Sequence, residues 1–390
     1  MKKITIVGRG TAGCLAATYF AKQTDWEIDW IYDPNIKQQA VGEGTSLIVP
    51  IRLGLDLDFN VVELQELYGT PKLGIRKMNW GQVNNDFTHT FPPPSHGYHF
   101  NAVMLQDYII KRLTDNKRVN MIYKNINNHS ELDTDFIIDC SGKPKDFSEF
   151  NIRTEIPVNA VSVKQCAWEG ARFSQTLTIA RPYGWVFGIP LLNRCAIGYM
   201  YNKDINTLEE VQQDAEIIYK EFNLTPSEVG NNFTFMNYTK KQNFYDNVAY
   251  NGNASSFLEP LEATSLYTVI VNNIWAHQVF TKKLSVDEAN ANYQDDLDSI
   301  SNMIMLHYFA GSTFDTEFWR EAKNRANDRM NIAKQNKKFT TMINACNMVD
   351  KKRELVFGTL GEFGTWPGRS YMANLAGLGI KESLTDFLKN

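Results

Sequence analysis

The sequence predicts a mixed α/β fold: a doubly wound nucleotide-binding domain with an additional β-sheet region, followed by a helical C-terminal part. Three observations support this prediction. A short apolar strand at the N-terminus runs into a glycine-rich turn and a helix, a later apolar strand ends in Asp-Cys-Ser-Gly, and the composition becomes helical and charged from about residue 281. With 390 residues and 43% hydrophobic content, the chain can bury a large core. We therefore expect a core of residues 1–280 and a helical region of residues 281–390.

The N-terminal turn has the composition of a dinucleotide site. It consists of Gly8, Arg9, Gly10, Thr11, Ala12 and Gly13. In this GxGxxG arrangement, Gly8 permits a tight turn, Gly10 lets the backbone approach a pyrophosphate, and Gly13 allows close packing of helix on sheet. A second strand ends at Asp33, 20 residues beyond Gly13, where a carboxylate can accept a hydrogen bond from a ribose. A glycine turn within any doubly wound sheet is the plainer alternative, and the spaced acid favours the nucleotide site.

Net charge and cysteine usage argue against several classes of partner. The formal charge is −4 and no run of Lys and Arg could follow a phosphate backbone, so we expect no nucleic acid. The five cysteines are odd in number and lack CxxC spacing, so we expect reduced thiols and no metal site. No signal peptide or membrane-spanning segment is evident, so we expect a cytoplasmic protein without a membrane partner. The sequence leaves a homo-oligomer open.

Three further strings contain residue types typical of catalysis. They are LYGTPKLGIRKMNWG with Lys72, SSFLEPLEATSLY with Glu262, and RPYGWVFGIP with Trp185. Together with the glycine turn, these strings resemble segments of the flavin-dependent halogenases related to the tryptophan halogenases. The resemblance covers most of the chain and is weakest after Arg320. Lys72 and Glu262 are 190 residues apart in sequence, so only the fold could bring them together.

The resemblance implies FAD as the cofactor. Beyond the glycine turn and Asp33, the residues that it places beside FAD are Gly42, Glu43, Gly44, Thr45, Asp139, Gly142, Gly252 and Asn253. Each position could be an ordinary strand-to-turn junction, and their order along the chain favours the flavin site. We expect FAD to arrive reduced, as FADH2, from a separate flavin reductase, because the sequence has no second dinucleotide fingerprint. Halide ion and dioxygen are the implied co-substrates.

Lys72 lies in an apolar context, between Pro71 and the run Leu73-Gly74-Ile75. Most lysines are solvated surface residues, as we expect of Lys77, but burial of Lys72 would disfavour its charged form and lower the pKa of its amine. In the family that the sequence resembles, the lysine of this motif holds or captures hypohalous acid. The resemblance therefore implies that Lys72 is catalytic.

Glu262 precedes the pattern of a largely buried helix, LYTVIVNNIWAHQVF. Thr264 or Ser265 is expected to be its N-cap, and the free N–H groups of a first helical turn attract anions. The resemblance implies that halide binds at Thr264 and Ser265, and that Glu262 orients the electrophile or takes the departing proton. In the plainer interpretation, Thr264 and Ser265 only cap the helix and Glu262 complements its dipole.

The strand around Trp185 is expected to form a wall between flavin and substrate. The family pattern is GWxWxIP, and this sequence has Trp185, Ile189 and Pro190 with Phe187 in place of the second tryptophan. Phenylalanine keeps the aromatic bulk and loses the indole N–H, so a separating role is compatible with the change. An aromatic strand packed in the core would have the same residue types.

His96, His99 and Phe100 are candidate substrate contacts, because an aromatic substrate is held well by stacking side chains. A proline-rich turn leading into a strand would explain them equally. The chain is also shorter than the usual tryptophan enzymes, so we expect part of their substrate-covering structure to be absent.

The implied function is halogenation of an electron-rich aromatic small molecule, such as an indole or a phenol. Reduced FAD, dioxygen and chloride, bromide or iodide yield hypohalous acid, which is relayed to Lys72 and then halogenates the ring. An FAD-dependent aromatic monooxygenase is the first alternative, and it would have no need for Lys72 with Glu262. An inactive flavin-binding descendant is the second.

Overall fold

The computed structural model describes residues 1–36, 42–81, 86–168, 170–348, 362–363 and 366–389. Contacts between residues group the chain into two compact units, each assembled from separate segments. Unit 1 comprises Met1–Lys72, Pro94–Ile152 and Tyr238–Gln294, and unit 2 comprises Leu73–Pro93, Arg153–Asn237 and Asp295–Asn390. These units do not coincide with the expected division at residue 280, since segment 73–93 pairs with strands about 100 residues later. The division into a core of residues 1–280 and a helical region of residues 281–390 stays a prediction.

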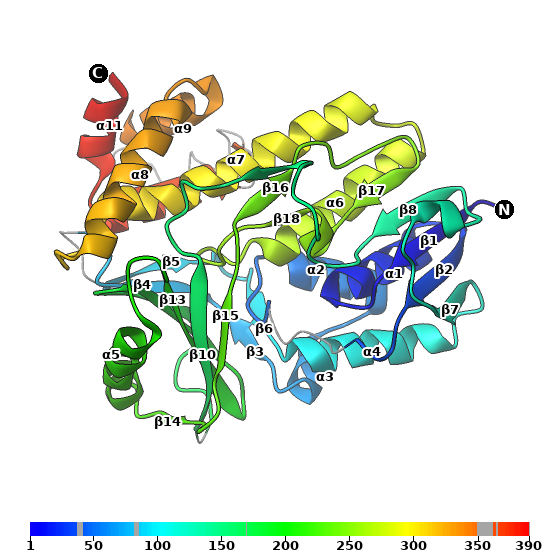
Figure 1. The fold of residues 1–390 in the computed structure, drawn as a ribbon, viewed down its shortest axis with the longest axis horizontal. Helices are drawn as coiled ribbons and strands as arrows, with labels where there is room; N and C mark the ends of the chain where they lie inside the picture. Colours follow the sequence, from blue (N-terminus) through cyan, green and yellow to red (C-terminus); the bar gives the residue numbers. More distant parts are fainter. Residues whose placement is uncertain (37–41, 82–85, 169, 349–361, 364–365, 390) are drawn as a thin grey trace. The chain divides into compact units, whose positions relative to one another are not determined.

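Unit 1 is built on a five-stranded sheet in the order β17-β8-β1-β2-β7, in which all neighbours are parallel (Figure 1). Together with those outside this sheet, the strands of unit 1 are β1 (Lys3–Val7), β2 (Glu27–Tyr32), β3 (Thr70–Lys72), β6 (Gly97–His99), β7 (Val119–Tyr123), β8 (Phe136–Asp139), β9 (Phe150–Ile152), β16 (Tyr238–Lys240), β17 (Val248–Tyr250) and β18 (Ser256–Phe257). Its helices are α1 (Thr11–Gln23), α2 (Ile48–Leu57), α3 (Val61–Glu66), α4 (Ala102–Thr114), η1 (His129–Glu131), η2 (Gly252–Ala254) and α6 (Ser265–Phe280).

The parallel sheet of unit 1 forms because its strands are short apolar runs separated by crossovers. All four residues of β8 and the last four of β1 are buried. Such strands need cover on both faces of the sheet, which is typical of doubly wound folds. Helix α1 packs against β1, β2 and β8, and nine of its residues are buried. The predicted parallel α/β core is therefore confirmed.

Unit 2 contains an eight-stranded sheet in the order β14-β10-β13-β12-β11-β4-β5, with β15 paired to β10. Its strands are β4 (Gly74–Met78), β5 (Asp86–Thr90), β10 (Ala160–Ala167), β11 (Thr176–Arg181), β12 (Gly184–Pro190), β13 (Arg194–Tyr201), β14 (Thr225–Pro226) and β15 (Asn231–Thr234), with the separate pair β19 (Glu362–Phe363) and β20 (Trp366–Pro367). Its helices are α5 (Leu208–Glu221), α8 (Glu317–Ala333), α9 (Lys337–Met348), α10 (Gly368–Gly377) and α11 (Lys381–Lys389). Helix α7 (Val286–Ala310) contributes residues to both units.

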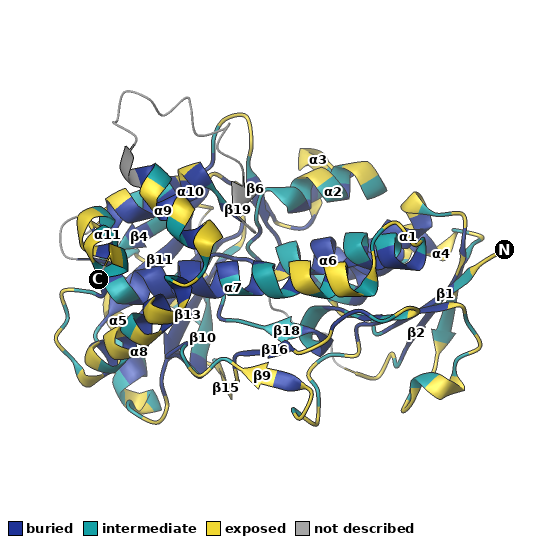
Figure 2. Ribbon diagram, turned by 90° about the horizontal axis from the view of Figure 1, so that it is seen from above, coloured by how far each residue is buried: buried dark blue, intermediate teal, exposed yellow. Residues whose placement is uncertain are grey.

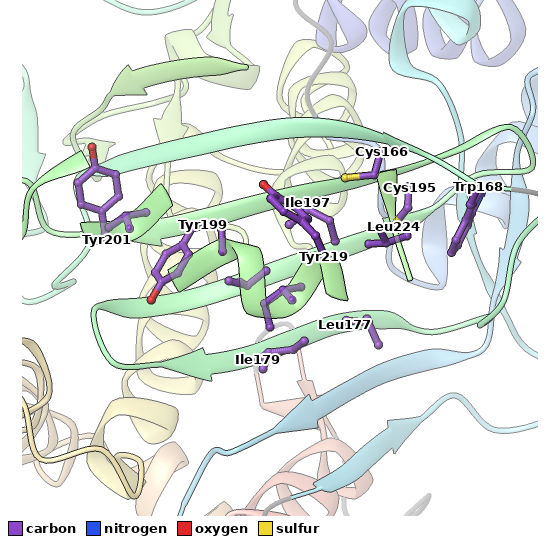
Figure 3. Packing of buried hydrophobic residues seen from close by; sticks show 14 of the residues in the cluster. Cys166, Trp168, Leu177, Ile179, Cys195, Ile197, Tyr199, Tyr201, Tyr219 and Leu224 are labelled. Carbon is purple, nitrogen blue, oxygen red and sulfur yellow. The ribbon is translucent and has the colours of Figure 1, made fainter. Parts of the chain in front are cut away.

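Helix α5 packs its apolar stripe on the sheet of unit 2. Its buried residues Val211, Ala215, Ile218 and Tyr219 recur at helical spacing, and a capping box at Thr207 starts the helix. Figure 3 shows Tyr219 among side chains of the sheet strands. The opposite side of α5 is exposed (Figure 2). This packing gives the sheet its own hydrophobic core, as expected for the additional β-sheet region.

Helices dominate the C-terminal part from residue 286 onward, as predicted. Within unit 2, the Trp80 ring contacts the rings of Trp319 and Tyr308, with centroids 5.4 and 5.7 Å apart. Edge-to-face contacts of this kind add to the burial of large rings. Across the described ranges, no helix combines the length and the apolar character needed to cross a membrane.

Candidate active site

The glycine turn joins the end of β1 to the start of α1. Gly8 has a φ of +104°, and a Cβ added there would lie 2.3 Å from the Cys140 carbonyl oxygen. A Cβ added at Gly13 would lie 2.0 Å from the Gly8 carbonyl oxygen. Only glycine is compatible with such close backbone approaches. Around Gly10, in contrast, nothing lies within 4 Å of an added Cβ, so this position faces open space.

The first turn of α1 fits an anionic cofactor. Gly10 is the N-cap, no side chain caps the helix, and the first turn contains no acidic residue. Backbone N–H groups at such a helix end attract phosphate, which is the part of FAD that a GxGxxG turn is expected to bind. The Thr11 hydroxyl is fixed from the side, because Gln106 of α4 donates a hydrogen bond to it over 3.0 Å.

Two other predicted cofactor segments meet the glycine turn. A Cβ added at Gly252, which has a φ of +58°, would lie 2.6 Å from the Ala12 Cβ. The neighbouring Asn253 carbonyl accepts a hydrogen bond of 2.7 Å from the Tyr238 hydroxyl. Gly142 has a φ of +99° and open space around it. The turns after β1, β8 and β17 therefore lie together, although they are far apart in sequence.

Asp33 directly follows the carboxyl end of β2, and Asp139 is the last residue of β8. The Asp33 Oδ1 accepts hydrogen bonds of 2.8 and 3.0 Å from the backbone and side chain of Asn35. Asp139 is bonded to His129 Nε2 (2.8 Å) and accepts from the Ser141 N–H (2.9 Å). Burial raises the pKa of Asp139, but the bonds from His129 and Ser141 outweigh it and hold the pKa below its usual value. Direct contact of either carboxylate with the cofactor stays a prediction.

Residues 42–45 pair with β6 like an additional strand. The Thr45 N–H donates to the Tyr98 carbonyl over 3.0 Å, and the Thr45 hydroxyl accepts from the Tyr98 N–H over 2.7 Å. The Phe100 N–H donates to the Glu43 carbonyl over 3.0 Å. The Glu43 carboxylate accepts from the Ala102 N–H at the start of α4, at 3.4 Å. The turn is thus held rigidly by backbone and side-chain bonds.

Lys72 lies on β3, which pairs with the other edge of β6. In this antiparallel register Lys72 is opposite Gly97, and Thr70 is opposite His99. His99 also forms a bridge with Gly44 of the turn. Lys72 is 0% exposed, in agreement with its apolar sequence context. Strand β6 therefore connects Lys72 directly to the turn 42–45.

Glu262 lies in a tight turn before α6 and is buried. The next residue, Ala263, has a φ of +55°, which is uncommon without glycine, and its N–H donates to the Pro260 carbonyl over 3.0 Å. Thr264 is the N-cap, as expected, but its side chain makes no capping bond and the first turn contains no acidic residue. Thr264 is buried and Ser265 is exposed. This helix start therefore has the chemistry that suits an anion.

The residues of the predicted wall all lie on β12 in unit 2. Trp185 is fully buried, and its ring centroid is 6.3 Å from that of Phe187. The Phe187 ring covers Gly198 on β13, where an added Cβ would lie 2.0 Å from the ring. Ile189 and Pro190 complete the strand. Their role in separating flavin from substrate stays a prediction.

Two candidate substrate contacts differ in exposure. His96 is half-buried, with its Nδ1 3.2 Å from the Pro94 carbonyl oxygen and its ring 5.4 Å from that of Tyr98. Phe100 is 0% exposed. Contact of these two residues with a substrate stays a prediction.

The sequence interpretation missed three features of the site and its surroundings. Gln106, which positions the Thr11 hydroxyl, stands out in sequence only as a polar residue within the apolar stripe of α4. Thr70, which bonds His99 over 3.1 Å, gave no sequence signal because its partner is on another strand. The expectation that Lys77 lies on the surface was wrong. It is 0% exposed: β4 is an inner strand between β5 and β11, and the Lys77 side chain lies on a covered face of the sheet.

The sequence matches the protein family described as Tryptophan halogenase over residues 3–129 and 112–386. The chain belongs to the tryptophan halogenase family. Membership in this flavin-dependent family implies the use of FAD, halide and dioxygen. The glycine turn and its open first helical turn fit the dinucleotide part of that cofactor.

Individual members of the tryptophan halogenase family agree with this assignment. RebH, a tryptophan 7-halogenase of Lentzea aerocolonigenes, is 24% identical over 484 aligned residues, which cover 97% of this chain and 89% of RebH. Because the alignment is longer than this chain, RebH has segments without a counterpart here. A tryptophan halogenase structure from Shewanella frigidimarina superimposes with a TM-score of 0.79 at 18% identity, covering 100% of this chain and 93% of the other. The structure of the tryptophan 5-halogenase MibH superimposes with a TM-score of 0.80 at 18% identity, and the match covers 100% of this chain and 90% of MibH. These structures share the fold.

We expect Gly10→Val to weaken FAD binding by about a hundredfold or more, because the new side chain enters the space reserved for the pyrophosphate. Gly10 has a φ of −63° and no close neighbours, so the variant should keep the wild-type melting temperature. FAD titration by fluorescence and a thermal melt of the apoprotein measure both quantities. Gly13→Ala is the contrasting variant, which should destabilise the fold itself. Wild-type FAD affinity in Gly10→Val would overturn the nucleotide assignment.

Proposed function

We propose that this chain is an FADH2-dependent halogenase acting on an electron-rich aromatic small molecule, indole-like or phenol-like. Family membership supports the reaction class. The observation that carries the assignment to this chain is the place of Lys72, which is buried on a strand that β6 connects to the turn 42–45, whereas the equally buried Lys77 lies on β4 of unit 2. Lysine is almost never fully buried without a specific reason, because its charged form loses hydration. Its strand is also paired, through β6, with the turn 42–45, within the unit that contains the glycine turn and Glu262.

Lys72 is proposed to handle the halogenating agent. When bound, reduced FAD supplies, with dioxygen and halide, the hypohalous acid that the reaction consumes. Lys72 holds this acid by donating a hydrogen bond, or captures the halogen as a haloamine. Its burial keeps bulk water away from the agent and fixes the direction of delivery. The ring then forms a carbon–halogen bond, the bond between halogen and oxygen or nitrogen breaks, and the ring loses a proton.

Glu262 and the start of α6 are proposed to complete the chemistry. The Glu262 carboxylate orients the electrophile or takes the ring proton. Thr264 and Ser265 are proposed to hold halide, supported by the uncapped first turn of α6. The left-handed Ala263 links the two functions, since its backbone fixes how the carboxylate is oriented relative to the helix start.

The partners follow from the same chemistry. We propose a separate flavin reductase, because the printed sequence contains one complete GxGxxG. The aromatic rings of Trp185 and Phe187 are proposed to separate the substrate from the flavin. An FAD-dependent hydroxylase is not favoured, because the family is that of the tryptophan halogenases and a hydroxylase has no use for Lys72 with Glu262.

Lys72→Ala should abolish directed halogenation and spare the earlier steps. We expect the variant to bind FAD and consume dioxygen at wild-type rates, while halogenated product falls by about 10²-fold or more, because positioning and delivery are lost. Glu262→Gln should also slow halogenation and spare flavin oxidation, since the amide keeps the shape and lacks the charge. Dioxygen uptake and product formation are measured in the same reaction.

The matched control for Lys72→Ala is Lys111→Ala, which removes an exposed lysine on α4 of the same unit. It should leave both dioxygen uptake and product unchanged. If Lys72→Ala forms product at the wild-type rate and at the same ring position, Lys72 is a bystander and the proposed mechanism is wrong.

The substrate range should be broad. RebH has segments that this chain lacks, which supports a less covered substrate site. We therefore expect several indoles and phenols to be halogenated in order of ring nucleophilicity, with free tryptophan a poor substrate. A screen with FAD, a flavin reductase, NADH and each halide, read by mass spectrometry, measures this order. Strong selectivity for one ring position of free tryptophan would contradict the prediction.

A further inference from the structure

Three side chains share one face of the β3–β6 pair. Thr70 and Lys72 are both buried while Pro71 between them is exposed, so the two side chains point to the same side of β3. His99 lies directly opposite Thr70 on β6 and diagonal to Lys72. Gly97, opposite Lys72, has no side chain to compete with the lysine for this face. The arrangement places the imidazole of His99 on the same face of the strand pair as the lysine that is assigned to the chemistry.

His99 is fixed by Thr70 and held neutral. Its Nδ1 is 3.1 Å from the Thr70 hydroxyl, and the side chain is 0% exposed. Burial lowers the pKa of His99 well below its usual value, and the positive charge of Lys72 contributes a smaller part of the same effect. The imidazole can therefore hold its hydrogen bond to Thr70 at neutral pH without adding a charge next to Lys72.

We propose that His99 is a positioning residue for Lys72: its bond to Thr70 links β3 to β6 on the face that Lys72 shares, and so limits the movement of the lysine that delivers the halogen. The proposal rests on the proposed function of Lys72. It gives His99 a role at the amine in place of the expected contact with substrate.

A neutral hydrogen-bonding side chain is the one chemistry that suits this position. A carboxylate in place of His99 would pair with Lys72 and occupy its ammonium group. A second cation would repel it, and at short distance in a poorly hydrated site that repulsion is large. An apolar side chain would leave the Thr70 hydroxyl without its bond to β6. Imidazole avoids all three problems.

Other charged groups near β6 have partners of their own. The described elements that pair with or pack against β6 include Glu43 of the turn 42–45, and Arg52 and Asp56 of α2. The Glu43 carboxylate accepts from the start of α4. Arg52 and Asp56 form an ion pair with each other over 2.7 Å. The positive charge of Lys72 does act on His99 and adds to the effect of burial in lowering the pKa of the imidazole.

The first test compares His99→Leu with His99→Asn. Asn keeps a polar atom near the position of Nδ1, so it should preserve the bond to Thr70, whereas Leu removes it. For His99→Leu we expect wild-type FAD affinity and dioxygen uptake, but about tenfold less product per dioxygen consumed, with hypohalous acid released instead. His99→Asn should recover most of this loss, and Thr70→Val should reproduce it. Wild-type product yield in His99→Leu, or an Asn variant as poor as Leu, would overturn the proposal.

The second test does not depend on activity. Nitrogen-15 NMR of the six histidines, with the His99 signal assigned by its absence in His99→Asn, reports the protonation of His99 directly. In the wild type His99 should stay neutral as the pH falls below the range in which exposed histidines titrate. In Lys72→Met its midpoint should rise, because removing a nearby positive charge makes protonation easier. An unchanged midpoint would show that His99 and Lys72 do not interact.

The two proposals can fail separately. A wild-type enzyme that yields no halogenated product would overturn the proposed function, whatever the NMR result. A wild-type enzyme that halogenates, with an unchanged His99 midpoint in Lys72→Met, would overturn only the positioning role.

Discussion

The proposed chemistry depends on one backbone connection: β6 is paired on one edge with residues 42–45 and on the other with Lys72 on β3. Neighbouring strands lie about 4.8 Å apart, so the backbone of Lys72 is held about 10 Å from that of the turn. Peptide hydrogen bonds fix this separation far more tightly than side-chain contacts could. A reagent made beside the turn would therefore have to travel a short and constant distance to reach the lysine.

The site combines tightly packed positions with positions that have open space around them. Gly8 and Gly13 bring α1 against the sheet with no space for a Cβ, while Gly10 and the uncapped first helical turn stay open. Lys72 and Glu262 are buried, and burying ionisable groups lowers the stability of a fold. Such local costs are typical of functional sites, where the surrounding packing stabilises an arrangement that stability alone would not select.

Local patterns predicted much of this arrangement. The glycine turn, its helix and the burial of Lys72 followed from short sequence windows, because close backbone approach and apolar flanks leave a clear trace. Strand pairing between segments that are far apart in sequence leaves no such trace in a short window. The parallel pairing of β4 with β11 makes β4, which contains the buried Lys77, an inner strand and builds unit 2 from distant segments, and no local pattern indicates it. The bond between Thr70 and His99 was missed for the same reason, since each residue alone looks like an ordinary strand position.

The most direct test of the account asks where the oxygen of dioxygen goes. The enzyme is incubated with FAD, a reductase, NADH, bromide and an indole under oxygen-18 gas, and the mass of the product is measured by mass spectrometry. The account predicts a product with the bromine isotope doublet and no oxygen-18, because the oxygen of hypobromous acid leaves in water, whether the bromine passes to the ring directly or through the Lys72 amine. A product that gains one oxygen-18 atom and contains no bromine would contradict it, and would identify the chain as a hydroxylase.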